Sequence, residues 1–125
     1  MGNKTKFYYK VVDSDYNSVS IHTSNPYCLH YELNKEVKGY KGTGIFIFKS
    51  LRETREFAGF THKILKVEAV NPKSTNCVAF LEGSFFPTKQ ECIEAFWFHP
   101  EKRQILLAPK GTYVADSIIP REFLI

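Results

Sequence analysis

The side chains in this chain that could do chemistry do not form a known catalytic signature. The sequence contains none of four common signatures: the zinc motif H-E-x-x-H, the G-x-S-x-G nucleophile turn, the phosphate-binding loop and the dinucleotide fingerprint. No histidine stands at metal-ligand spacing from any of the three cysteines, which are Cys28, Cys77 and Cys92. We therefore expect no catalytic residue, no metal and no cofactor, and a binding role becomes the first hypothesis.

The segment 38–44, with the sequence KGYKGTG, is the strongest candidate for binding an anion. Its three glycines allow the backbone to present successive N–H groups, and lysines flank them. The candidate side chains here are Lys38, Tyr40, Lys41 and Thr43. The spacing is not that of a known phosphate loop, so a plain connection between two strands explains the segment equally well.

Two arginines follow in the first turns of a predicted helix. Arg52 and Arg55 come just after Ser50, a natural N-cap, and the free N–H groups of a helix start favour an anion. The alternative is that these arginines pair with the neighbouring Glu53 or Glu56.

An aromatic loop and a basic turn complete the candidate binding set. Phe85 and Phe86 follow a glycine, and an exposed ring there would stack on a base or enter a partner's pocket. The alternative is that both rings cover the core. Lys110 and Thr112 form a basic turn with a hydroxyl donor, to which Arg103 and Arg121 add charge, although an ordinary hairpin turn also accounts for it.

Composition limits the class of protein. The chain has 125 residues, 43% of them hydrophobic and 15% aromatic, which predicts a single domain over residues 1–125 with a real core. The net charge of +4 is spread along the chain, so no specific nucleic-acid partner is expected. No apolar run approaches the roughly 20 residues that cross a bilayer, and the start lacks a signal peptide. We expect a cytoplasmic protein with reduced cysteines.

The hydrophobic pattern predicts short strands and two helices. Capping boxes at Ser50 with Glu53 and at Thr88 with Glu91 start the helices. Period-2 alternation and apolar runs predict the strands: 7–12 in a hairpin with 19–21, then 27–33, 45–48, 65–69, 77–81, 105–107 and 113–119. The segment 71–76 is predicted to be a turn. The predicted fold class is α+β, a mostly antiparallel sheet packed by two helices in one domain.

Part of the chain resembles small phage and prophage proteins. The stretch GTGIFIFKSLRETREFA (42–58) carries the resemblance, with FYYKVV before it and HKILKVEAV after it. The order of elements is similar to that of the phage anti-Thoeris sponges, which bind cyclic ADP-ribose isomers. The strand and helix also resemble ADP-ribosyltransferase domains, but no His-Tyr-Glu or Arg-Ser-Glu set stands at matching positions.

The resemblance implies a non-enzymatic anti-defence protein that sequesters a phosphate-containing nucleotide signal. Lysines and arginines would hold the phosphates, and a Phe or Tyr would stack on the base. A homo-oligomer is expected, because one small domain offers little concavity. Two alternatives stay open. One is an inhibitor that binds a protein through an apolar patch at Phe85 and Phe86 or at the tail 123–125. The other is an ADP-ribosyltransferase-like enzyme.

Overall fold

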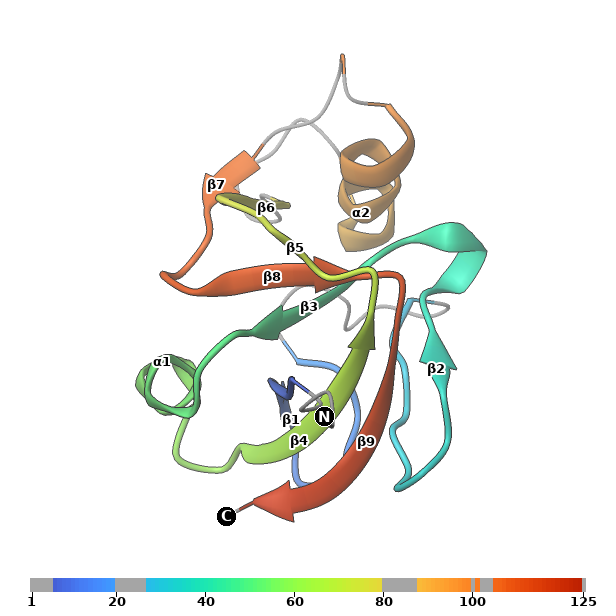
Figure 1. Ribbon diagram of the computed structural model, residues 1–125. Coiled ribbons are helices and arrows are strands. Elements are labelled where there is room, and N and C mark those ends of the chain that lie inside the picture. The colour runs from blue at the N-terminus through green and yellow to red at the C-terminus, as the bar shows by residue number, and fades with distance from the viewer. Residues whose placement is uncertain (1–5, 20–26, 80–87, 100, 102–104, 125) are drawn as a thin grey trace, which may run out of the picture.

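The fold consists of one large antiparallel sheet, one small sheet and two helices (Figure 1). A computed structural model describes residues 6–19, 27–79, 88–99, 101 and 105–124. The seven-stranded sheet has the order β2 (Val37–Lys38), β9 (Ser117–Leu124), β4 (Lys63–Val70), β1 (Tyr8–Val12), β3 (Ile45–Phe48), β8 (Thr112–Ala115) and β5 (Lys73–Ser74). The second sheet pairs β6 (Cys77–Ala79) with β7 (Ile105–Leu107). The helices are α1 (Leu51–Phe57) and α2 (Lys89–Phe98), so the predicted α+β class is confirmed.

The large sheet curls because two of its strands are joined by a single residue. β8 and β9 are separated in the sheet by β3, β1 and β4, yet only Asp116 connects them. The N–H of Asp116 donates to the carbonyl of Val70 over 2.9 Å, which fixes this corner on β4. The predicted single strand over 113–119 is therefore wrong. Its residues are mostly apolar and β-branched or aromatic, and no Gly or Pro marks the corner, so the segment has the composition of one strand.

The curled sheet encloses the core on one side and carries the helices on the other. Ile45 and Ile47 of β3 are fully buried in the core cluster with residues of β1, β4, β8 and β9. Phe46, between them, points to the opposite face, as strand alternation requires. There its ring centroid lies 6.1 Å from that of Phe96 and 5.6 Å from that of Trp97, so β3 anchors α2.

Both predicted capping boxes are present. Ser50 Oγ accepts from the Glu53 N–H over 3.2 Å and donates to the Glu53 carboxylate over 2.8 Å. Thr88 Oγ1 makes the same two bonds with Glu91, over 3.1 and 3.0 Å. Each cap oxygen satisfies one backbone donor, the N3 amide, that the first turn of a helix leaves free, and each glutamate carboxylate accepts from the cap hydroxyl.

Three local predictions near strands were wrong or incomplete. Residues 27–33 form no strand and make one isolated bridge, between His30 and Asn17. The alternation of apolar and polar residues there reflects burial of the Tyr27 and Tyr31 side chains, without a hydrogen-bonded strand ladder. Among the described residues, β1 makes one bridge, from Val12 to Ser18, with the segment after its turn, and residues 20 and 21 of the predicted hairpin lie outside the described part of the chain. β1 pairs along its length with β4 and at one register pair with β3. The predicted turn over 71–76 contains the short strand β5.

None of the helices in the described part of the chain has both the length and the apolar character needed to cross a bilayer.

Candidate functional site

The most unusual side chain of the described residues is a lysine in the interior. Lys10 is the central residue of β1, and its Cβ lies on the strand face of the core residues Tyr8 and Val12. Its long side chain extends to the main chain of the neighbouring strand β3. Only 7% of Lys10 is exposed. Its Nζ donates to the carbonyl oxygen of Phe46 over 2.8 Å and lies 5.8 Å from the centroid of the Tyr31 ring.

The strand register explains why the Phe46 carbonyl is available to this lysine. β1 and β3 share one register pair, which joins Tyr9 to Phe48. Phe46 lies two residues earlier on β3, beyond that pair, where its carbonyl accepts from the Lys10 side chain. The amine thus satisfies a sheet carbonyl in the interior, as buried backbone groups require.

Lys10 has no acidic partner among the described residues. The ion pairs found there join Lys35 to Glu32, Arg52 to Glu56 and Arg121 to Glu68. Burial lowers the pKa of Lys10 from its usual 10.5 to about 8. At neutral pH the group is still mostly protonated, so an ammonium ion is held in the interior without a counter-ion from these residues. A buried charge in that state is costly.

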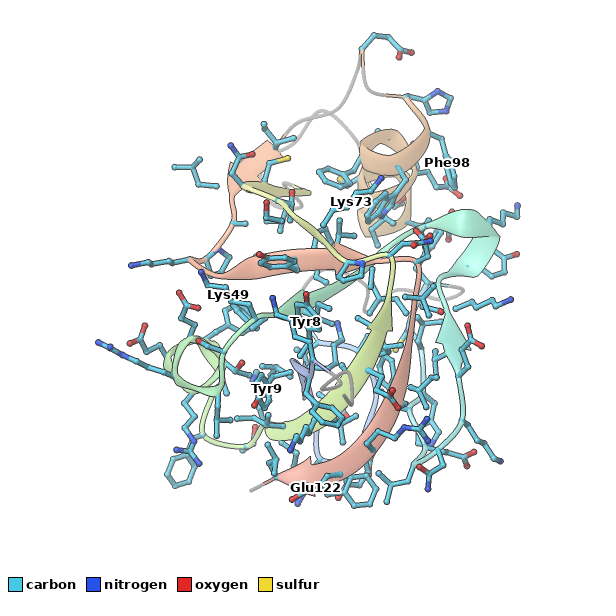
Figure 2. All side chains as sticks on the ribbon, viewed as in Figure 1. Tyr8, Tyr9, Lys49, Lys73, Phe98 and Glu122 are labelled. Carbon is cyan, nitrogen blue, oxygen red and sulfur yellow. The ribbon has the colours of Figure 1, made fainter. Side chains whose placement is uncertain are left out.

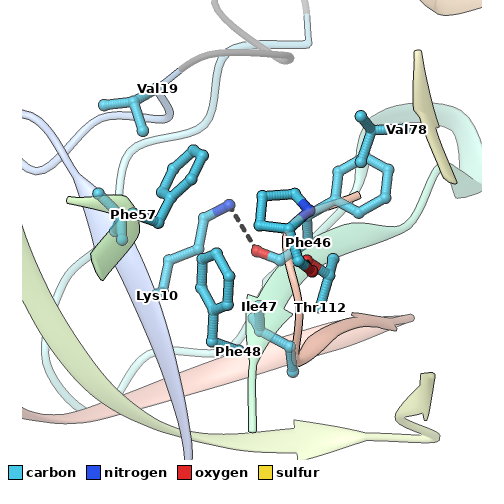
Figure 3. Close-up of a pocket in the computed structure, with 10 residues that line it drawn as sticks. Lys10, Val19, Phe46, Ile47, Phe48, Phe57, Val78 and Thr112 are labelled. Atoms are coloured by element: carbon cyan, nitrogen blue, oxygen red, sulfur yellow. Dashed lines mark hydrogen bonds between the residues drawn. The ribbon is translucent and has the colours of Figure 1, made fainter. Parts of the chain in front are cut away.

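A small cavity opens beside this amine (Figure 3). Its volume is about 90 Å³, and its walls include the rings of Phe46, Phe48 and Phe57. Aliphatic carbons of β6 and of the residues after β1 line it too, and Lys10 is the one titratable group among the ten described residues that line it. A cavity of about 150 Å³ holds benzene, so this one has room for about four non-hydrogen atoms. The site combines an apolar body with one hydrogen-bond donor.

The glycine loop 38–44 does not form an open anion nest. Lys38 and Lys41 are exposed, but Thr43 is buried, and an added Cβ at Gly39 would lie 1.7 Å from the Thr43 carbonyl oxygen. This glycine therefore serves close backbone packing. The Tyr40 ring packs edge-on against that of Tyr27, with centroids 5.4 Å apart.

The hollow that Lys38 lines is not basic. It has a volume of about 370 Å³, and its walls also carry the carboxyl-bearing residues Glu36 and Asp116. Two acidic groups oppose an anion there, because like charges repel.

The predicted arginines do not converge on one anion site. Arg52 forms an exposed i,i+4 pair with Glu56, with 3.5 Å between Nε and Oε1, as the alternative interpretation proposed. Arg55 is exposed on the same helix, and Glu53 occupies the helix start. Arg121 pairs with Glu68 and donates to the side-chain oxygen of Asn34 over 2.9 Å.

The basic turn borders a third, polar hollow. Thr112 lines it with Lys49, Thr75, Asn76 and Tyr113, and its volume is about 660 Å³. Lys110 precedes Gly111 at its rim. Lys49 and Tyr8 both lie close to β8 in Figure 2, and the Lys6 Nζ lies 5.9 Å from the centroid of the Tyr113 ring. The sequence had not singled out Lys6, Lys49 or Tyr113.

These positions do not form one site. The loop 38–44 and the basic turn lie at opposite ends of β3, because Ile45 pairs with Ala115 and Phe48 with Thr112. Phe85, Phe86 and Arg103 lie outside the described residues. Phe123, in the predicted apolar tail, belongs to β9, and its ring packs against Tyr16 with centroids 4.6 Å apart.

Sequence reasoning missed Lys10, although its signal was visible. A lone lysine stands within the otherwise apolar strand FYYKVV, and a continuous apolar run is typical of a strand that is covered on both faces. No group of His, Cys, Asp and Glu among the described residues is arranged to hold a metal ion.

Comparison of the chain with protein-family models, with curated proteins and with solved structures gave no significant match.

Proposed function

We propose that this chain is a non-enzymatic binding protein for a small carboxylate with an apolar body, held in the cavity beside Lys10. One observation carries the proposal: a buried ammonium group, without an acidic partner among the described residues, faces an apolar cavity. A ligand carboxylate would supply the missing counter-ion. The aromatic walls would cover the alkyl part.

The donor capacity of the lysine fits such a ligand. An ammonium group carries three N–H donors, and one of those of Lys10 goes to Phe46. The cavity of about 90 Å³ has room for the four carbon atoms of a short branched acid such as isobutyrate, with its two carboxylate oxygens at the amine, or for the acyl end of a larger molecule. A ligand of this size reaches a Kd of about 0.1 to 1 mM.

The test is a titration of the whole chain with isobutyrate at pH 6.5 and at pH 9.5, in which NMR chemical shifts measure binding. We expect binding at the lower pH and roughly 30-fold weaker binding at the higher pH, because the ammonium form of a group with a pKa of about 8 is then scarce. Lys10→Met abolishes binding, whereas Lys63→Met, an exposed lysine of β4, leaves it unchanged. Equal binding by the wild type and Lys10→Met would overturn the proposal.

Nucleotide sequestration, which the phage resemblance implies, is the second candidate. The polar hollow beside β5 and β8 favours it, because Lys49 and several hydrogen-bonding groups line it together with Tyr113. Lys49 would hold a phosphate, and Tyr113 would contact the base. In this proposal the protein acts in the host cytoplasm as a homo-oligomer.

Calorimetric titration with cyclic nucleotides and ADP-ribose isomers tests this second candidate. Binding that Lys49→Ala weakens, and that Lys63→Ala does not, is the expected result. Absence of heat with every ligand at high protein concentration would exclude it.

A further inference from the structure

The placement of Lys10 suits a covalent reaction as well as an ionic contact. We infer that the Lys10 amine forms an imine with short aliphatic aldehydes that enter the same cavity. This inference rests on the ligand cavity of the proposed function and adds a second ligand class. The geometry that supports it is an amine held at the wall of an apolar space by a neutral carbonyl, with no carboxylate from the described residues to keep it protonated.

The amine must be neutral to attack a carbonyl carbon. Burial lowers the pKa of Lys10 to about 8, so about half of the molecules carry the neutral amine at pH 8. An exposed lysine, with a pKa of about 10.4, is neutral in roughly 0.4% of molecules at that pH. Lys10 is therefore the preferred nucleophile among the lysines that the structure describes, as for other desolvated lysines that form Schiff bases.

Among the described residues, no acidic or basic side chain lines the cavity beside Lys10 and disfavours its neutral amine. β3, α1, β6 and β8 present carbonyl, aromatic, aliphatic and hydroxyl groups to the cavity. The Tyr31 ring is a titratable neighbour of the amine, with its centroid 5.8 Å from the Nζ atom. Burial raises the pKa of the Tyr31 hydroxyl, which therefore stays neutral.

The reaction balances without an added oxidant or reductant. The nitrogen lone pair attacks the aldehyde carbon and forms a C–N bond. Both amine protons pass to the former carbonyl oxygen, which leaves as water, and a C=N bond remains. The apolar walls hold the alkyl group of the aldehyde and exclude water, which slows hydrolysis of the imine.

Reductive trapping tests the inference on the whole chain. The protein is incubated with isobutanal and cyanoborohydride at pH 8, and the modified lysines are identified by peptide mass spectrometry. We expect one isobutyl group on Lys10, formed at least tenfold faster than on the exposed Lys63. Equal modification of Lys10 and the surface lysines would overturn the inference.

A variant that fills the cavity separates the site from intrinsic reactivity. Val78→Phe, in the cavity wall, should slow modification of Lys10 at least tenfold, whereas Val70→Phe, at an exposed position, should not. Circular dichroism checks that both variants fold. If Val78→Phe does not fold, the ratio of Lys10 to Lys63 modification in the wild type remains decisive.

Isobutyrate competition distinguishes this inference from the proposed function. If isobutyrate binds and Lys10 is not trapped, the imine inference fails and the carboxylate proposal stands. If Lys10 is trapped selectively and isobutyrate neither binds nor slows trapping, the carboxylate proposal fails and the imine inference stands.

Discussion

The Nζ atom of Lys10 lies 2.8 Å from the carbonyl oxygen of Phe46, and this hydrogen bond links two strands that share one register pair. The side chain thus does at the centre of the sheet what a backbone amide does in a regular ladder. It also places a positive charge among aromatic rings. The arrangement satisfies a buried carbonyl at the cost of desolvating an ammonium group.

Replacing this lysine should change the pH dependence of stability. The folded-state pKa of Lys10 is about 8, below the ordinary 10.5, so the unfolded chain binds more protons between these values. The wild type therefore gains free energy of unfolding as the pH rises from 8 to 10.5, by about 3 kcal/mol in total, whereas Lys10→Met does not. Urea unfolding of both proteins from pH 7 to pH 10.5 measures this. A difference that stays constant with pH would contradict the burial of the charge.

Two glycines of the same loop should respond differently to alanine. A Cβ at Gly39 would meet the Thr43 carbonyl oxygen at 1.7 Å, so the backbone itself must move. Gly42 has φ +79° and nothing within 4 Å, so its replacement brings only backbone strain. We expect Gly42→Ala to cost about 1 kcal/mol and Gly39→Ala at least about 3 kcal/mol. Thermal unfolding of the pair tests this, and equal losses would refute the packing role of Gly39.

The Tyr27 hydroxyl should titrate at lower pH once its carboxylate neighbour is neutral. Burial, the hydrogen bond with Glu94 and the charge of Glu94 together raise the pKa of Tyr27 to about 12, with burial as the largest cause. The hydroxyl donates to Glu94 over 2.9 Å. Glu94→Gln should lower this pKa, and the exposed Glu91→Gln should not. Difference absorbance titrations against Tyr27→Phe resolve the transition. No shift in Glu94→Gln would argue against this contact.

Helix caps should contribute measurably to stability. Ser50→Ala and Thr88→Ala each remove the acceptor of an N3 amide, which costs about 1 kcal/mol. Thr61→Ala, in an exposed turn, should cost less than about 0.5 kcal/mol. Urea unfolding compares the three variants. If the cap variants match Thr61→Ala, the boxes seen here do not stabilise the helices.

Local signals predicted much of the secondary structure. Ile45–Phe48 is an apolar run, and it forms the strand between β1 and β8. The alternation over 27–33 misled, because burial of Tyr27 and Tyr31 produces a period of two without a hydrogen-bonded ladder. Likewise, the corner at Asp116 has no Gly or Pro, and the pair Asp116 and Ser117 is a weaker turn signal between apolar residues.

The amino-acid sequence by itself determined the α+β class, the central strand and both helix starts, because each depends on residues only a few positions apart. Tertiary structure alone decided the candidate site. Lys10 meets the Phe46 carbonyl across 36 positions of sequence, and the cavity also needs Phe57 and Val78 from other elements. Sheet register and curl bring these groups together, and a pattern of nearby residues does not encode how distant strands pair.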